Sequence, residues 1–195
     1  LEASTETTGS KGGETIVATL NGNLSMDGVI DANGNLVDLG GYDVAITADV
    51  RSPDGGLNLT NLDAKGTMLF GGATVSQAGL YQVDSTELGY LQAGFETINI
   101  GDEFSANQIQ FGATGTTDTT TIEFRDDVVL NNPMVGGKIE LNQAVSVDGD
   151  FSVTGSGFTT YWNQNASLTT TGNLSIDDSL ILTGHVVATA GSDGS

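Results

Sequence analysis

Cysteine is absent from the 195-residue chain, and proline, histidine and the basic residues are rare. The lack of cysteine excludes disulfide frameworks, zinc–thiolate sites and cysteine nucleophiles. Only five Lys and Arg residues stand against 25 Asp and Glu residues, so the formal net charge is −20. Because this charge repels phosphates and anionic lipids, we expect neither nucleic acid nor a membrane surface as a partner. The charge suits a saline or calcium-containing exterior.

Long apolar runs are also missing, so the sequence predicts no segment that spans a bilayer. The opening residues, LEAST, have no initiator Met and no apolar signal core, and we expect a mature fragment or a segment of a longer protein. Residues 1–13 and 191–195 are polar and Gly-rich, which predicts a linker and a tail. A single β domain is expected between them, over residues 14–190.

What the chain does contain is a short repeated motif, Gly-x-apolar-x-apolar. The nonapeptide GNLSMDGVI (22–30) returns as GNLSIDDSL (172–180), and related copies begin at Gly55, Gly137 and Gly149. Glycine favours a turn, and the two apolar residues after it point to one face of a strand. Stacking such units buries a core that no single unit can bury alone. The motif therefore predicts an all-β parallel β-helix of eight or nine coils, each of about 20 residues.

Within such a helix, the two nonapeptides predict a shared interior column. In that column Leu24 and Met26 would stack in line with Leu174 and Ile176.

An antiparallel β-sandwich is the alternative fold. Asn-Gly and Asp-Gly pairs such as Asn21-Gly22, Asp54-Gly55 and Asp148-Gly149 are strong signals for two-residue hairpins. A sandwich uses such hairpins between short strands. The literal repetition of one motif favours the β-helix, because a sandwich does not need it.

One stretch departs from the β pattern. In DSTELGYLQAGF, Asp84 and Ser85 are suited to cap a helix, and Glu87 lies in its first turn. The spacing predicts a short helical insertion over residues 85–93 that ends at Gly94.

Two longer stretches, GLYQVDSTELGYLQAGFETINIG (79–101) and GSGFTTYWNQNASLTTTGNLSIDD (155–178), are similar to parts of known proteins. They resemble segments of the giant bacterial surface and secreted proteins related to filamentous haemagglutinin. The resemblance implies a right-handed parallel β-helix and a non-enzymatic stalk or adhesin segment, extracellular or on the bacterial cell surface. It implies as partners neighbouring segments of the same protein, and surface glycans or proteins. A self-assembling filament subunit and a carbohydrate-active β-helix are the alternatives.

The sequence favours no enzyme activity. Paired carboxylates at Asp126-Asp127 and Asp177-Asp178 are the kind of residues that glycosidases use, but the rest of a polygalacturonase-like pattern is missing. His185 is the only histidine available to a Ser/His/Asp triad, and it lies in a strand-like stretch.

Two sets of residues are candidates for binding. Asp27, Asp31, Asn33 and Asp38 supply closely spaced oxygen atoms that suit a calcium ion as a cofactor, although Gly34 does not match the EF-hand loop. Tyr161 and Trp162, in FTTYWNQN, are candidates for stacking on sugar rings. The alternative for Trp162 is a place in the core.

Overall fold

The computed structural model describes residues 16–19, 23–26, 28–63, 66–74, 79–102, 108–131, 135–164 and 166–191. These residues form strands β1 to β21 and one short helix, α1 (Ser85–Leu88). Every registered strand pair within them is parallel, so the all-β prediction is confirmed and the antiparallel sandwich is wrong. The predicted linker (1–13) and all but the first residue of the predicted tail (191–195) lie outside the described residues.

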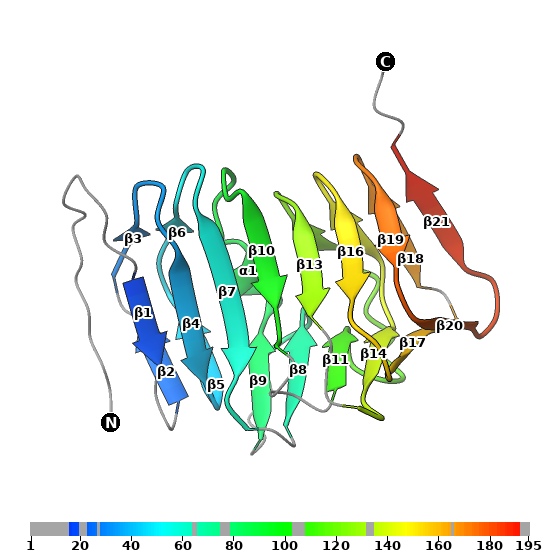
Figure 1. The fold of residues 1–195 in the computed structure, drawn as a ribbon. Coiled ribbons are helices and arrows are strands. Elements are labelled where there is room, and N and C mark those ends of the chain that lie inside the picture. Colours follow the sequence, from blue (N-terminus) through cyan, green and yellow to red (C-terminus); the bar gives the residue numbers. More distant parts are fainter. Residues whose placement is uncertain are drawn as a thin grey trace.

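The largest sheet has seven strands, which lie side by side in chain order (Figure 1). They are β1 (Ile16–Thr19), β4 (Val37–Gly41), β7 (Gly56–Asn61), β10 (Thr97–Ile100), β13 (Val128–Asn131), β16 (Phe151–Thr154) and β19 (Leu174–Ile176).

A second sheet has six strands, β20 (Ser179–Leu182), β17 (Thr159–Trp162), β14 (Lys138–Leu141), β11 (Gln108–Phe111), β8 (Thr67–Phe70) and β9 (Leu80–Val83). A third has four, β12 (Ile122–Phe124), β15 (Val145–Val147), β18 (Ser167–Thr170) and β21 (Val187–Ala190). Two strand pairs complete the set, β2 (Asn23–Met26) with β5 (Asp43–Ile46), and β3 (Ile30–Asp31) with β6 (Val50–Arg51).

Strand numbers advance by three from one neighbour to the next in the seven-stranded sheet. We call each set of three consecutive strands, beginning with a strand of this sheet, a rung. The described residues make seven rungs, whereas eight or nine coils were predicted for the whole chain. Register partners are about one rung apart in sequence, as Val37 with Leu57 and Phe151 with Leu174.

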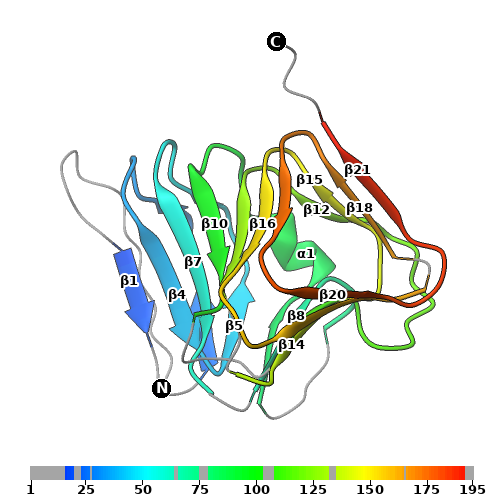
Figure 2. The ribbon, with the colours of Figure 1, turned by 45° about the vertical axis from the view of Figure 1, so that its right-hand side comes forward.

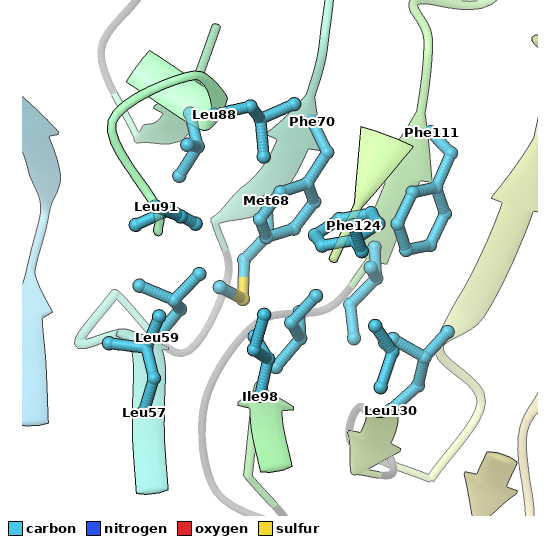
Figure 3. Packing of buried hydrophobic residues seen from close by; sticks show 14 of the residues in the cluster. Leu57, Leu59, Met68, Phe70, Leu88, Leu91, Ile98, Phe111, Phe124 and Leu130 are labelled. Atoms are coloured by element: carbon cyan, nitrogen blue, oxygen red, sulfur yellow. The ribbon is translucent and has the colours of Figure 1, made fainter. Parts of the chain in front are cut away.

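The core lies between the sheets, because alternate residues of each strand point inward (Figure 2). Strand β7 shows the pattern, with Leu57 and Leu59 fully buried between half-exposed neighbours. Figure 3 shows these leucines beside Met68, Ile98 and the aromatic cluster. In that cluster the Phe70 ring stacks on the Phe111 ring at 5.4 Å between centroids, and Phe124 meets Phe111 edge-on at 6.0 Å.

The repeated motif marks strands but not a single column. Leu57/Leu59, Phe151/Val153 and Leu174/Ile176 all lie in the seven-stranded sheet, in β7, β16 and β19. Leu24 and Met26 lie in β2, which pairs with β5 instead. The predicted stacking of the two nonapeptides in one column is therefore wrong, because the same local pattern serves strands of different sheets.

Helix α1 begins where predicted and ends early. The Asp84 side chain accepts from the backbone N–H groups of Thr86 and Glu87, and the Glu87 carboxylate accepts from the N–H of Asp84, forming a capping box. The helix is a single turn that stops at Gly89, not an insertion over 85–93.

The segment after the helix returns to β pairing, because Leu91 forms a parallel bridge with Val50 of β6. The α1 segment also packs against β12, so it occupies the place of a strand between β6 and β12 (Figure 2). Leu88 and Leu91 point into the core there. The insertion is therefore part of the third rung rather than a flap outside the sheets.

Replacement of Leu174 tests the inward register of the last rung. Leu174 packs against the core and pairs with buried Phe151, so Leu174→Asp should lower the free energy of unfolding by about 1–3 kcal/mol. Ser175→Asp, on the exposed side of the same strand, should change it by less than about 0.5 kcal/mol. Chemical denaturation measures both. Equal effects of the two variants would contradict the register.

Candidate functional site

A column of turn side chains joins the last three rungs. Asp127, Asp150 and Asn173 stand immediately before β13, β16 and β19. The Asp127 Oδ1 atom accepts a hydrogen bond from the N–H of Asp150 at 2.8 Å, and Asp150 Oδ1 accepts from the N–H of Asn173 at 2.7 Å. Each carboxylate thus satisfies a backbone donor of the next rung, and charge makes these bonds stronger than neutral ones.

Two glycines of the repeated motif leave room for this column. A Cβ atom on Gly149 would overlap the Asp127 carboxylate, and one on Gly172 would overlap the Asp150 carboxylate. Gly149 also has a positive φ of 148°. At Gly172 the requirement is space between rungs, which differs from the turn conformation that the sequence pattern predicts.

The outer face of the seven-stranded sheet carries a broad hollow. We call it the polar groove. It has a volume of about 720 Å³ and is lined by outward side chains of β4, β7, β10, β13 and β16 and of the loops beside them. The residues that line it are Asp38, Gly40, Asn58, Thr60, Leu62, Asn99, Gly101, Asp102, Asn131, Thr154, Gly155 and Ser156.

Amide and hydroxyl groups form most of the polar surface of the groove. The Asn99 side-chain amide donates to Asn58 Oδ1 at 3.1 Å, between neighbouring strands. Asn131 donates to the Gly101 carbonyl oxygen at 3.3 Å, and the Thr154 hydroxyl donates to the Leu130 carbonyl at 3.3 Å. These bonds hold the side chains in fixed positions along the groove.

Two carboxylates, Asp38 and Asp102, line the same groove. Partial burial raises the pKa of Asp38, and the negative charge of Asp102 raises it further. These two carboxylates make the lining of the groove acidic. None of its lining residues is Lys or Arg.

The structure describes three of the four predicted calcium ligands. Asp27 lies outside the described residues. Asp31 forms an ion pair with Arg51 at 2.9 Å and accepts from the N–H of Asn33 at 3.3 Å. Asn33 is an exposed turn residue with φ of 48°, while Asp38 lies beyond it in β4, in the polar groove. The described residues contain no group of three or more acidic, His or Cys side chains suited to a metal ion.

The predicted sugar-stacking pair points in opposite directions. Trp162 is 2% exposed and belongs to the core cluster, so its ring offers no face to a sugar. Its neighbour Tyr161 is half-buried on the outer side of β17. The strand alternation separates the two rings, and only Tyr161 keeps access to the surface.

The paired carboxylates face backbone donors rather than one another. Asp126 accepts from the N–H of Gly94 at 2.7 Å, and burial raises the pKa of its carboxyl. Asp178 accepts from the N–H groups of Gly157 and Ser179, both at 2.6 Å, and these bonds lower its pKa. His185 is exposed near the C-terminal end. These contacts give the carboxylates a structural role between rungs.

The C-terminal rung leaves its inward side chains exposed. Leu180 and Leu182 are 42% and 57% exposed, whereas their register partners in the preceding rung, Thr160 and Trp162, are 1% and 2% exposed. Asn173 ends the turn column in the same rung, and no described residue donates a hydrogen bond to its side-chain oxygen. This end of the stack therefore exposes apolar side chains at positions that are buried in the preceding rung.

Comparison of the chain with protein-family models, curated proteins and solved structures found no match. No helix of the described residues has the length and apolar character needed to cross a membrane.

Sequence reasoning missed the polar groove. Its Asn58 and Asn99 were visible only as polar residues alternating with apolar ones, a pattern that marks any outward strand face. Their alignment depends on a register between residues 41 positions apart, which local patterns do not specify.

Gly172→Ala tests the space requirement of the turn column. The added methyl group would overlap the Asp150 carboxylate, so the variant should lose about 1–3 kcal/mol of folding free energy. Asp150→Ala removes an acceptor and the nearest obstacle, while backbone atoms of Gly149 and Asp150 remain 2.9 and 3.0 Å from the added methyl group. The double variant should therefore be more stable than the sum of the single effects predicts. Denaturant unfolding of all four proteins measures this coupling, and strictly additive effects would contradict it.

Acidification tests the buried carboxylates. Burial raises the pKa of Asp38, Asp43, Glu87 and Asp126, so the folded state binds protons more readily than the unfolded state. Their contribution to stability is then fully present below the ordinary carboxyl pKa and is lost as pH rises through the raised values. The melting temperature should therefore rise as pH falls from neutral towards the ordinary carboxyl pKa of about 4.

The melting temperature of the Asp38→Asn variant should rise less on acidification than that of the unmodified chain. Asp118→Asn is the control, because Asp118 is fully exposed and hydrogen bonding to Thr120 lowers its pKa. A melting temperature that falls over this range would contradict the prediction.

Proposed function

We propose that this chain is a non-enzymatic structural segment of an extracellular or bacterial surface protein. It is a right-handed parallel β-helix that acts as a stiff stalk and presents or joins binding surfaces. The proposal follows the resemblance to the filamentous-haemagglutinin-related proteins and the advance of three strand numbers between neighbours in the seven-stranded sheet. Right-handedness is the expected hand for connections between parallel strands of one sheet.

The observation that carries the proposal is the difference between the last rung and the one before it. Thr160 and Trp162 are buried in the rung before the last. Their register partners in the last rung, Leu180 and Leu182, are exposed. Exposing apolar side chains on the end of a stack costs free energy, which a further rung recovers by covering them. A fold in which each rung covers the apolar side chains of its neighbour is suited to length and stiffness.

Self-assembly is the second candidate, and the same exposed end favours it. Strands β19, β20 and β21 each end a parallel ladder, so each offers unpaired backbone groups along one edge. Such edges can pair with strands of another copy and give a filament. The surface negative charge opposes close approach of copies at low salt.

Extension of the chain tests the stalk proposal. Three extra copies of residues 149–171, joined after Gly191, should lengthen the particle by about 14 Å, since each rung adds about 4.8 Å. They should also raise the melting temperature by several degrees, because the leucines of the last rung become buried. Small-angle scattering and calorimetry measure the two effects.

A scrambled extension of the same composition is the control. An added segment that scatters as a flexible tail and leaves the melting temperature unchanged would contradict the proposal. Regular filaments of the unextended chain in electron micrographs would instead favour the assembly subunit.

A further inference from the structure

The polar groove crosses five adjacent strands of the seven-stranded sheet, from β4 to β16. Neighbouring strands lie about 4.8 Å apart, so four spacings give the groove a length of about 19 Å across the strands. Its long direction therefore follows the stack of rungs. A ligand that fits it is extended and repeats at about the spacing of the strands.

The groove offers polar side chains in two rows that are offset by two residues along the strands, because Asn99 is the register partner of Val129 and not of Asn131. Asp38, Asn58 and Asn99 are direct register partners in β4, β7 and β10. Asn131 and Thr154 are register partners in β13 and β16. Together they provide amide donors, amide and carboxylate acceptors, and a hydroxyl group.

The chemistry of the groove excludes several kinds of ligand. The carboxylates of Asp38 and Asp102 disfavour phosphates, sulfates and uronates. An extended peptide gains affinity by pairing its backbone with a sheet edge, but this groove lies on a sheet face whose backbone groups are paired in the ladders. Leu62 is the one large apolar residue of the lining, which leaves little for an apolar ligand.

We infer that the polar groove binds an extended polysaccharide of neutral or amino sugars, which lies across the strands with about one sugar ring per rung. A pyranose ring in an extended chain has a length comparable to the strand spacing, and its hydroxyl groups match the alternating donors and acceptors of the groove. An amino group is favoured near Asp38 and Asp102. This inference goes beyond the proposed function, because the groove is present whether or not the segment serves as a stalk.

Binding depends on hydrogen bonds along the groove, since its lining contains no aromatic ring. Each sugar then contributes little, because water competes for the same groups. Affinity should therefore increase with chain length until the sugars fill the groove, at about four or five units.

Isothermal titration with defined oligosaccharides tests the inference. The probes are hexamers of β-1,4-linked glucose and glucosamine and of α-1,4-linked galacturonate, together with the glucose dimer. The glucose and glucosamine hexamers should bind, while the dimer and the galacturonate hexamer should bind at least about tenfold more weakly.

Two variants locate the site. Asn58→Ala removes an amide from the row, and Thr60→Leu replaces a groove hydroxyl with a larger apolar side chain. Each variant should lower the affinity for the glucose hexamer about tenfold. Asn163→Ala is the matched control, because Asn163 belongs to a similar amide pair with Asn142 outside this groove. It should leave binding unchanged. Thermal melts establish that each variant is folded. If Asn58→Ala does not fold, Thr60→Leu alone tests the site.

Three results would overturn the inference. The first is no heat of binding with either the glucose or the glucosamine hexamer at millimolar concentration. The second is binding that Asn163→Ala weakens as much as Thr60→Leu does. The third is binding of glucosamine alone that salt abolishes and Thr60→Leu leaves intact, which would indicate attraction to the overall charge.

Discussion

Parallel backbone pairing between rungs is the constraint on which the rest of the structure depends. The N–H and C=O groups of a parallel strand cannot pair within that strand, so each must find a partner on a neighbouring strand, which in the seven-stranded sheet belongs to the adjacent rung. Leu57 in β7 is thus held between Val37 of the preceding rung and Ile98 of the following one. A core then needs only alternate apolar residues, and the outer positions accept polar groups such as Asn58 and Asn99.

The turns meet the same constraint with side chains. Where the chain leaves one strand for the next, Asp127 and Asp150 accept the backbone N–H groups that the next rung presents. These bonds require glycine at positions 149 and 172, because a side chain there would overlap the carboxylate of Asp127 or Asp150. Some of the acidic residues therefore form hydrogen bonds between rungs, and the motif glycines at 149 and 172 lie next to those bonds.

The sequence predicted the strands and the strand direction well, because alternation and repetition are local signals. Leu57/Leu59 and Phe151/Val153 lie inward as expected, and Asp84 caps the helix as expected. Long-range register was harder to predict. It placed Leu24 and Leu174 in different sheets, returned Leu91 to β pairing, and aligned Asn58 with Asn99. Trp162 lies inward because its strand alternates, a fact that composition alone does not fix.

Residue-resolved hydrogen exchange of the unextended chain tests most directly whether each rung depends on its neighbours. Stability in a stack is shared between adjacent rungs, so an uncovered end should open first. The account predicts the slowest amide exchange in β7, β10 and β13, and the fastest, among the paired amides, in β20 and β21. Amides of β20 and β21 that exchange as slowly as those of β10 would contradict it.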